Sequence, residues 1–510
     1  MKYYITTPLY YVNADPHIGH SYTNIACDAL ARFKRLKGDK VLFSTGTDEH
    51  GQKIKEAAEA KDMEPNVFVD TVVPRFKELW KKLNISYDDF IRTTEPRHER
   101  VVENILEILY KKGDLYEGEY SGWYCTPCES FWTKAQLVEE KCPDCKRSVE
   151  HIKEKNFFFR LSKYQKWLVD YINSHEGFIL PVIRRNEILS FLKNPLYDLC
   201  ISRPKSRLSW GVGIPFSRDH VTYVWFDALI NYISVCGYGD DEAKFNELWP
   251  ADLHMIGKDI LRPHTVYWPI MLHAVGLEPP KTVFAHGWWK IGGDKMSKSK
   301  GNIADPIDLV NRFGVDAYRF FLLREVPFGM DGSFSESALI SRINSDLAND
   351  LGNLLHRTLS MIEKYFSGVV PERRKTNSAD EITKCLIEKI NKLGPEITSA
   401  MDEIDFGKSI ASIWELINKS NKFIEQKAPW KLSKENKIEE LKDMMYDLYE
   451  ALRIVSMSLR PFLPMASDEM AEQLGLKKKQ GGLEDLRWGL KSSGAKIKKG
   501  KPLFPRIQVD

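Results

Sequence analysis

Two histidines around a glycine, His17 and His20 with Gly19, follow a short β-branched run and open a segment with the pattern of an amphipathic helix. The amino end of a helix offers backbone N–H groups and the positive end of the helix dipole, and two imidazoles add to both. This combination favours binding of a phosphate. Gly19 leaves room for a flat ring such as adenine or ribose against the backbone. The alternative is that the histidine pair is a local cap.

A lysine–serine segment, Lys295-Met296-Ser297-Lys298-Ser299, follows a predicted hairpin that turns at 292–293. Lysine is a flexible point charge that can follow a moving phosphate during a reaction. The alternative is a plain surface loop. Because the same chain carries the histidine–glycine segment, we favour a second polyphosphate-binding segment.

Four of the eight cysteines form two pairs with two residues between the members of each pair. Two such turns supply four thiolates to one tetrahedral ion and leave no open position, so we expect one structural Zn²⁺ per chain. Neither pair opens a helix in a βαβ setting, which argues against redox chemistry. The four expected ligands are Cys125, Cys128, Cys142 and Cys145, and the expected buried thiols are Cys27, Cys200, Cys236 and Cys385.

The elements that must position these residues are strands alternating with helices. Two strand–helix units occupy the first sixty residues, with strands near 4–7 and 41–45, and this rhythm predicts a parallel sheet. Ligands of such sheets bind beyond the carboxyl ends of the strands. Asp48 follows the second strand and suits a ligand ammonium group. The alternative for Asp48 is an N-cap of the next helix.

An apolar stripe follows at helical spacing, and a second group lies after a predicted strand at 253–257. Such stripes are usually core, but next to a strand end they also suit an apolar pocket with one polar tip. The stripe consists of Trp225, Ala228, Leu229 and Tyr232, and the second group consists of His264 and Trp268.

The chain after residue 305 reads as an all-α bundle, which predicts a docking surface. We expect helices around 337–366, 379–393, 399–426, 436–459 and 465–474, with breaks at Pro371, Pro395, Pro429 and Pro461. The candidate exposed residues are Asn353, Arg357 and Trp430. For Trp430 the alternative is packing between helices.

Length and composition set the outer limits. The 510 residues suffice for about three domains. The net charge of +3 requires no nucleic-acid partner. No run of about 18 apolar residues predicts a membrane span, and no export signal is recognisable at the amino end, so we expect a cytoplasmic protein.

The segments described above resemble the two signatures of class I aminoacyl-tRNA synthetases, His17-Ile18-Gly19-His20 and Lys295–Ser299. More narrowly, the chain is similar to the methionyl-tRNA synthetase family over essentially its whole length. Leu229 stands where some members have proline, and one four-cysteine site stands where some have two metal sites. The appended carboxy-terminal dimerising module of some relatives is not recognisable, so we expect a monomer. Further residues that carry the resemblance lie at 8–13, 45–51, 224–228, 257–260, 268–269 and 428–430.

The resemblance implies a methionine–tRNA ligase that uses ATP with Mg²⁺. Methionine would become methionyl-adenylate and then pass to the 3′-terminal adenosine of tRNA(Met). The implied catalytic residues are His17, His20, Lys295 and Lys298, and ATP binding would add Gly19, Gly257 and Asp259. The implied methionine site consists of Leu9, Tyr11, Asp48, Trp225, Ala228, Leu229, Tyr232, His264 and Trp268. Asn353, Arg357 and Trp430 would read the anticodon; for Arg357 a phosphate contact is the alternative.

The implied fold is α/β, a Rossmann-like parallel-sheet catalytic domain with a zinc-bearing insertion, followed by an all-α anticodon-binding domain. The expected divisions are two catalytic halves at 1–115 and 223–288, a connective insertion with the zinc knuckle at 116–222, a lysine-loop and stem-contact region at 289–350, and the helical domain at 351–510.

Three other functions compete with this prediction. Small nucleotidylyltransferases also place a His-x-Gly-His sequence at a first helix, but they lack the lysine–serine loop and the large bundle. Leucyl, isoleucyl or valyl enzymes of class I would need room for a large editing insertion. A zinc-bearing RNA-binding protein without catalysis would have no use for both histidines and both loop lysines.

Overall fold

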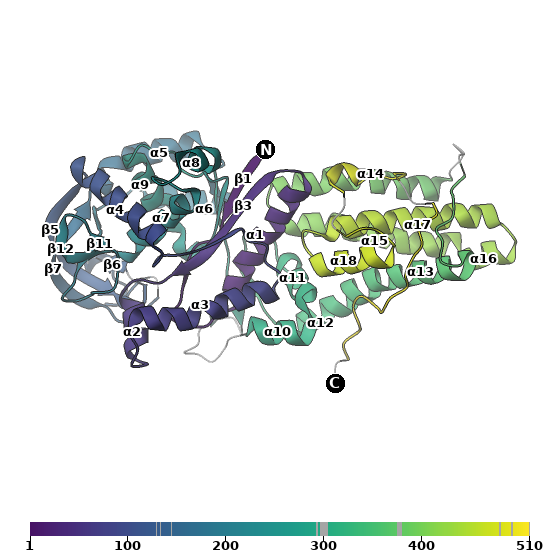
Figure 1. Cartoon of the computed structure of the whole chain (residues 1–510), viewed down its shortest axis with the longest axis horizontal. Coiled ribbons are helices and arrows are strands. Elements are labelled where there is room, and N and C mark those ends of the chain that lie inside the picture. The colour runs from purple at the N-terminus through teal and green to yellow at the C-terminus, as the bar shows by residue number, and fades with distance from the viewer. Residues whose placement is uncertain are drawn as a thin grey trace.

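A parallel sheet lies at the centre of the amino-terminal half of the chain (Figure 1). The computed structural model describes residues 1–508 apart from 129, 133, 144, 292–293, 296–303, 375–379, 479–480 and 491–492. In this part of the chain, seven strands form the sheet in the order β2-β3-β1-β13-β14-β8, with β4 also paired to β3, and all neighbours are parallel. The strands are β1 (Lys2–Thr6), β2 (Tyr10–Tyr11), β3 (Lys40–Asp48), β4 (Asp89–Arg92), β8 (Ile179–Leu180), β13 (Leu253–Gly257) and β14 (Val283–His286).

Hydrophobic cores lie on both faces of this sheet. Successive side chains of a strand point to opposite faces, and accordingly Ile5 of β1 belongs to one core while its neighbour Tyr4 belongs to the other. The predicted strand–helix rhythm is confirmed. The helices of this half are α1 (Ile18–Leu36), α2 (Gln52–Glu59), α3 (Pro65–Lys82), α4 (Pro96–Lys111), α5 (Gln165–Ser174), α6 (Val182–Phe191), α7 (Val224–Cys236), α8 (Glu242–Leu248) and α9 (Trp268–Ala274).

The chain segment between α4 and α7 contains mostly antiparallel strands outside the main sheet. The long pair β5 and β7 runs in register from Leu115 opposite Phe159 to Tyr124 opposite Glu150. The same region contributes β8 to the main sheet through its pairing with β14. The antiparallel strands are β5 (Leu115–Cys125), β6 (Ser130–Trp132), β7 (Glu150–Phe159), β9 (Leu199–Cys200), β10 (Ser202–Pro204), β11 (Gly213–Ile214) and β12 (Ser217–Thr222).

The carboxy-terminal half is helical, as predicted, apart from short strands. β15 (Trp289–Ile291) and β16 (Asp294–Lys295) precede its first helix, and β17 (Gly332–Ser333) lies between α11 and α12. The prediction of a break at Pro395 is wrong, because α14 continues through it. An internal proline costs about 3 kcal/mol, and buried side chains on both sides of it, such as Leu393 and Ile397, offset that cost. The helices are α10 (Pro306–Phe313), α11 (Val315–Arg324), α12 (Glu336–Arg342), a π-helical stretch (Ile343–Gly352), α13 (Asn353–Phe366), α14 (Glu381–Asp402), α15 (Phe406–Lys427), α16 (Pro429–Lys434), α17 (Ile438–Leu459) and α18 (Pro464–Gln473).

A buried arginine joins the two halves, which meet near α1 and α11 (Figure 1). Arg319 of α11 is fully buried and pairs with Asp28 of α1 at 2.7 Å. It also donates to the carbonyl oxygens of Leu83, Pro461 and Phe462 at 2.9–3.2 Å. Burial opposes ionisation of Asp28, but Arg319 and then Arg32 hold its pKa below the usual value. One hydrophobic core runs continuously from the sheet into the helical half.

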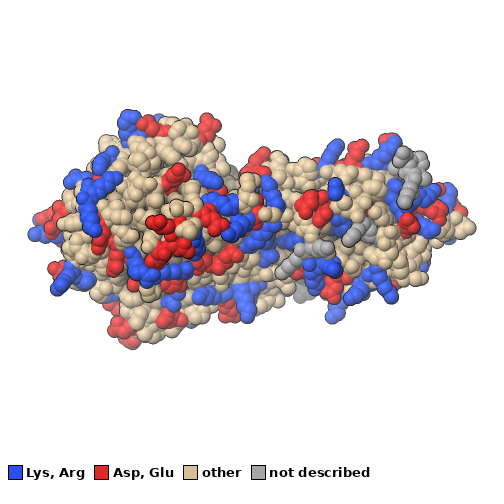
Figure 2. All heavy atoms as spheres, turned by 45° about the horizontal axis from the view of Figure 1, so that its top comes forward, with Lys and Arg blue, Asp and Glu red and all other residues tan. Residues whose placement is uncertain are grey.

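The surface carries both signs of charge. Figure 2 shows basic and acidic side chains interspersed over the visible face, in keeping with the net charge of +3. Among the described residues, no helix combines the length and the apolar character that crossing a membrane requires.

Candidate active site

The carboxyl ends of four neighbouring strands form the edge at which the predicted residues gather. β3, β1, β13 and β14 are adjacent and parallel, so Asp48, Thr6, Gly257 and His286 end their strands on the same side of the sheet. The order reverses at β1, since the chain passes from β1 to β3 on one side and β13 lies on the other. Such a reversal is where open α/β sheets bind ligands.

His17 and His20 form a reciprocal cap at the start of α1. The Nδ1 atom of His17 accepts from the Gly19 N–H at 3.1 Å, and the Nδ1 atom of His20 accepts from the His17 N–H at 3.3 Å. The two rings stack with centroids 3.8 Å apart. Because each Nδ1 atom accepts, a neutral ring carries its proton on Nε2. The two histidines therefore cap the helix through Nδ1 and can donate through Nε2. The cap and the phosphate-binding site predicted from the sequence are compatible.

Gly19 lies directly against the capping ring of His17. A Cβ at this position would lie 3.0 Å from the Cε1 atom and 3.1 Å from the Nδ1 atom of the His17 ring. Contacts this short would push the ring by a few tenths of an ångström, so Gly19 lets the His17 ring pack closely as well as leaving the backbone open.

Hydrogen bonds from its first turns fix α1 to two other elements. The hydroxyl of Thr23 lies 2.7 Å from the Nε2 atom of His286 at the end of β14. The hydroxyl of Ser21 lies 2.6 Å from that of Tyr318 on α11. Burial lowers the pKa of His286, so this ring is neutral at pH 7. These bonds hold the start of the helix against the strand ends.

Asp48 is the last residue of β3 and lies opposite Tyr11 of β2. The helix that follows is capped by Gly51, so the N-cap alternative for Asp48 is wrong. The side chain is buried. Leu9 immediately precedes β2 and packs against the core that contains Leu229 and Tyr232. The structure thus brings the predicted residues Leu9, Tyr11 and Asp48 together.

An aromatic cluster, defined here as Trp225, Tyr232, His264 and Trp268, connects α7 to the segment that starts α9. The hydroxyl of Tyr232 lies 2.8 Å from the Nε2 atom of His264, whose Nδ1 atom lies 2.9 Å from the Ile260 carbonyl oxygen. A carbonyl only accepts, so His264 donates from Nδ1 and accepts from Tyr232. Burial lowers the pKa of His264 to about 4. The cluster therefore presents rings and a neutral imidazole.

Packing completes the aromatic cluster. Ring centroids lie 5.8 Å apart for Tyr232 and Trp268 and 6.4 Å apart for Trp225 and His264. Ala228 and Leu229 are buried on the same helix, as their spacing predicts. Sequence reasoning missed His254 of β13, which stacks on Tyr232 at 4.0 Å and accepts from the Trp268 Nε1 atom.

Charged side chains surround the end of β13. Gly257 ends the strand, and the Oδ1 atom of Asp259 accepts from the Trp288 indole at 3.1 Å. Lys258 donates to both carboxylate oxygens of Asp331 at 2.7 and 2.9 Å, and Lys290 of β15 lies 2.8 Å from the same carboxylate. These contacts join the strand end to the hairpin that precedes the lysine–serine segment.

The lysine–serine segment is described only at its start. Lys295 ends β16, and its backbone pairs with Lys290 of β15. The side chain of Lys295 and the whole of Lys298 lie outside the described residues. Their predicted role as phosphate ligands stays a prediction.

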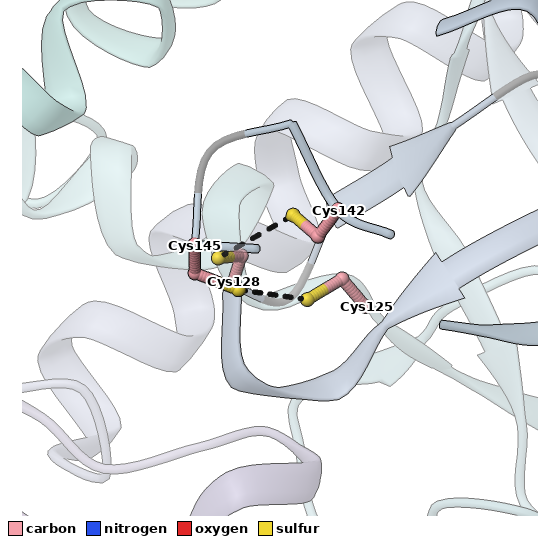
Figure 3. A group of neighbouring side chains, drawn as sticks. All are labelled: Cys125, Cys128, Cys142 and Cys145. Carbon is pink, nitrogen blue, oxygen red and sulfur yellow. Dashed lines mark hydrogen bonds between the residues drawn. The ribbon is translucent and has the colours of Figure 1, made fainter. Parts of the chain in front are cut away.

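The four cysteines converge at the end of the β5–β7 ladder (Figure 3). Their sulfur atoms all lie within 4.8 Å of one another, with 3.5 Å between Cys125 and Cys145 and 3.9 Å between Cys142 and Cys128. A tetrahedral shell with Zn–S bonds of about 2.3 Å has sulfur–sulfur edges of about 3.8 Å. The cluster can therefore hold a metal ion, and its donor set fits zinc.

The three residues predicted to read an anticodon lie on α13 and α16, which both contact α17. Asn353 starts α13, and one turn later Arg357 pairs with Glu425 of α15 at 2.6 Å. Trp430 lies on α16, which begins two residues after α15 ends, and 44% of its surface is exposed. Part of the Trp430 ring is therefore accessible, and its role stays a prediction.

The parallel sheet with its reversed strand order, the histidine-capped helix and the helical carboxy-terminal half together indicate a class I aminoacyl-tRNA synthetase. A family model described as tRNA synthetases class I (M) matches residues 3–152 and 145–359, and a model of the anticodon binding domain of methionyl tRNA ligase matches residues 370–509. The chain belongs to the methionyl-tRNA synthetase family. The predicted Rossmann-like fold with a helical anticodon domain and the predicted methionine–tRNA ligase function are confirmed.

Individual relatives cover the whole chain. It is 53% identical to the methionine–tRNA ligase of Caldanaerobacter subterraneus subsp. tengcongensis and 50% identical to that of Clostridium acetobutylicum, and spans 79% of each. Among solved structures, Mycobacterium tuberculosis methionyl-tRNA synthetase in complex with methionyl-adenylate is 40% identical with a TM-score of 0.95, over 99% of this chain and all of that one. The apo form of the same synthetase gives a TM-score of 0.88 at 37% identity, over 100% of this chain and 99% of that one.

Proposed function

We propose that this chain activates L-methionine with ATP and transfers it to tRNA(Met), with the residues at the strand ends in the following roles. The methionine carboxylate attacks the α-phosphate of ATP and pyrophosphate leaves. The product is methionyl-adenylate, and a ribose hydroxyl of the terminal adenosine of the tRNA then takes its methionyl group as AMP leaves. The observation that carries the proposal is the common edge at which the histidine-capped helix, Asp48 and the aromatic cluster meet.

No nucleophilic side chain is needed in this reaction, because the substrates supply the attacking oxygen atoms. Rate comes from positioning and from donors at the oxygen atoms on which charge develops. The Nε2–H groups of His17 and His20 are two such donors, and Lys295 and Lys298 are two more. Gly19, Gly257 and Asp259 would contact the nucleotide. Mg²⁺ would accompany the phosphates of ATP and neutralise part of their charge.

Methionine would lie between Asp48 and the aromatic cluster. The Asp48 carboxylate and the Leu9 carbonyl would bind its ammonium group, with Tyr11 beside them, and Ala228 and Leu229 would complete the apolar wall. Contacts between sulfur and aromatic rings are worth roughly 0.3–1.5 kcal/mol. Because this preference is small, homocysteine, which also carries sulfur, remains a competing substrate.

The helical half would recognise the tRNA. Single-stranded loops are where proteins read RNA sequence, and exposed aromatic rings stack on unpaired bases. Trp430 offers such a ring, and Asn353 and Arg357 offer hydrogen-bond donors on a helix that contacts α15. We propose that these three residues read the anticodon of tRNA(Met) and that the chain acts as a monomer.

The deciding experiment is exchange of labelled pyrophosphate into ATP. We expect exchange that depends on methionine and is absent with leucine or cysteine. In a second arm, Trp430→Ala should leave exchange unchanged and slow tRNA charging by about 5- to 150-fold, as expected for about 1–3 kcal/mol of stacking. Ile438→Ala, at another exposed position of the helical half, is the control. Exchange driven by leucine would refute the proposal that methionine is the substrate. Unchanged tRNA charging by Trp430→Ala would refute the proposal that Trp430 reads the anticodon.

We also propose that the four-cysteine cluster holds one structural Zn²⁺. Metal analysis should find one zinc per chain, and Cys142→Ser should release it and expose residues 116–222 to protease. Cys385→Ser is the matched control. Cys385 lies on α14 outside the cluster, and it is exposed, so the prediction that its thiol is buried is wrong. Full activity and protease resistance in a zinc-free chain would contradict a structural role.

A further inference from the structure

A buried carboxylate links the two segments that would bind methionine. Asp227 of α7 is fully buried. Its Oδ2 atom lies 2.7 Å from the Nδ1 atom of His50, and its Oδ1 atom lies 2.7 Å from the Nε2 atom of His98 on α4. His50 follows Asp48 by two residues at the end of β3. One carboxylate therefore connects α7, α4 and the β3 end.

The β3 end is held rigidly on its other sides. The Glu49 carboxylate accepts two bonds from Arg92, at 2.7 and 2.9 Å, and one from Thr94 at 2.7 Å. The indole of Trp210 donates to the Glu49 carbonyl oxygen at 2.6 Å. Asp48 and His50 on either side of Glu49 thus share an anchored backbone, and the Asp227–His50 bond transmits that anchoring to α7.

Helical geometry places Asp227 away from the methionine wall. At 100° per residue, Trp225, Ala228, Leu229 and Tyr232 share one face of α7, whereas Asp227 and Ser234 lie on roughly the opposite face. Ser234 also belongs to the network, because its hydroxyl lies 3.1 Å from the Nδ1 atom of His98. Bonds on the outer face fix the rotation of the helix, and that rotation sets where the inner face lies.

We propose that Asp227 is a positioning residue that sets the distance between the ammonium site at Asp48 and the thioether wall of α7, and so contributes to methionine specificity. A rotation of about 10° moves atoms at the helix surface, about 5–6 Å from the axis, by about 1 Å. Misplacement of about 1 Å can cost about 100-fold in rate. Burial opposes ionisation of Asp227, but His50 and then His98 lower its pKa to about 2, so the Asp227 carboxylate is charged at neutral pH.

The inference rests on the proposed function, and Asp227→Asn tests it. Asparagine keeps the shape and can accept only one of the two bonds. In the pyrophosphate exchange assay, we expect the kcat/KM ratio of methionine over homocysteine to fall at least about tenfold, with the KM for ATP unchanged. The concentration of active sites is measured from the burst of adenylate formation, and each rate is divided by it. Ser234→Ala, which removes a bond to His98 from the same face but leaves both bonds of the Asp227 carboxylate, should lower the ratio much less than Asp227→Asn does.

The possible outcomes distinguish a positioning role of Asp227 from an effect on stability alone and from failure of the proposed function. A lower melting temperature of Asp227→Asn with an unchanged methionine-to-homocysteine ratio would overturn the inference. A rise in the KM for ATP equal to that for methionine would do the same, since it would indicate general damage. Absence of methionine-dependent exchange in the wild-type chain would refute the proposed function instead.

Discussion

Replacement of His20 by asparagine is expected to slow adenylate formation by about 10²–10³-fold while the chain stays folded. The asparagine Oδ1 atom takes the place of Nδ1 and still accepts the His17 N–H, so the cap of α1 survives. The Nε2–H donor is lost. Because charge grows on the phosphate oxygens as pyrophosphate leaves, a missing donor raises the barrier. Methionine-dependent pyrophosphate exchange measures the rate, and thermal unfolding measures the stability.

His20→Gln is the matched variant, because the glutamine amide nitrogen can donate in place of Nε2, and glutamine at the third helical position can still accept from the N-cap N–H of His17. We expect it to retain much more of the exchange rate than His20→Asn. Its free energy of unfolding should stay close to that of the wild type, because the capping bond can be kept. An asparagine variant as fast as the glutamine variant would show that His20 acts only as a cap.

Arg319→Met is expected to lower the free energy of unfolding by about 3–5 kcal/mol. Methionine fills most of the volume but leaves the carbonyls of Leu83, Pro461 and Phe462 without their donor. It also leaves the buried carboxylate of Asp28 with Arg32 and Ser86 alone. The urea midpoint followed by tryptophan fluorescence should therefore fall, and adenylate formation should suffer because Asp28 lies on α1.

Lys34→Met is the control for this prediction. Lys34 lies on the same helix and pairs with Asp402 of α14 at 2.7 Å, but the carboxylate is 47% exposed. A partly exposed pair contributes about 0–1 kcal/mol, so this variant should unfold close to the wild-type midpoint. Equal losses in the two variants would mean that the junction depends on the number of ion pairs and not on the buried guanidinium.

The sequence was sufficient for most of the fold, because local patterns determine it. Strand–helix alternation predicted the parallel sheet, and the Cys-x-x-Cys spacing predicted the sulfur cluster. The spacing of Trp225, Ala228, Leu229 and Tyr232 predicted one helix face. Pro395 misled the prediction, since proline strongly disfavours a helix interior and only the packing of the whole bundle shows that α14 tolerates it.

The contacts that position the site could not be predicted. His50, His98 and Asp227 come from three elements, and no local pattern relates positions more than a hundred residues apart. In the sequence His254 is an ordinary strand residue. Only the tertiary structure shows that Tyr232 stacks on it and that Trp268 donates to it. Motifs therefore indicated which residues face the substrates, whereas the residues that support them emerged only from the tertiary structure.

The arginine at the junction limits how freely the two halves could be exchanged between relatives. A chimera that joins residues 1–369 of this chain to a foreign anticodon domain would keep the Arg319 guanidinium but replace the loop whose carbonyls, at Pro461 and Phe462, receive it. Such a hybrid would assemble poorly unless the loop between α17 and α18 of the foreign domain had the same backbone path. The domains are modular as recognition units, but they are not interchangeable parts.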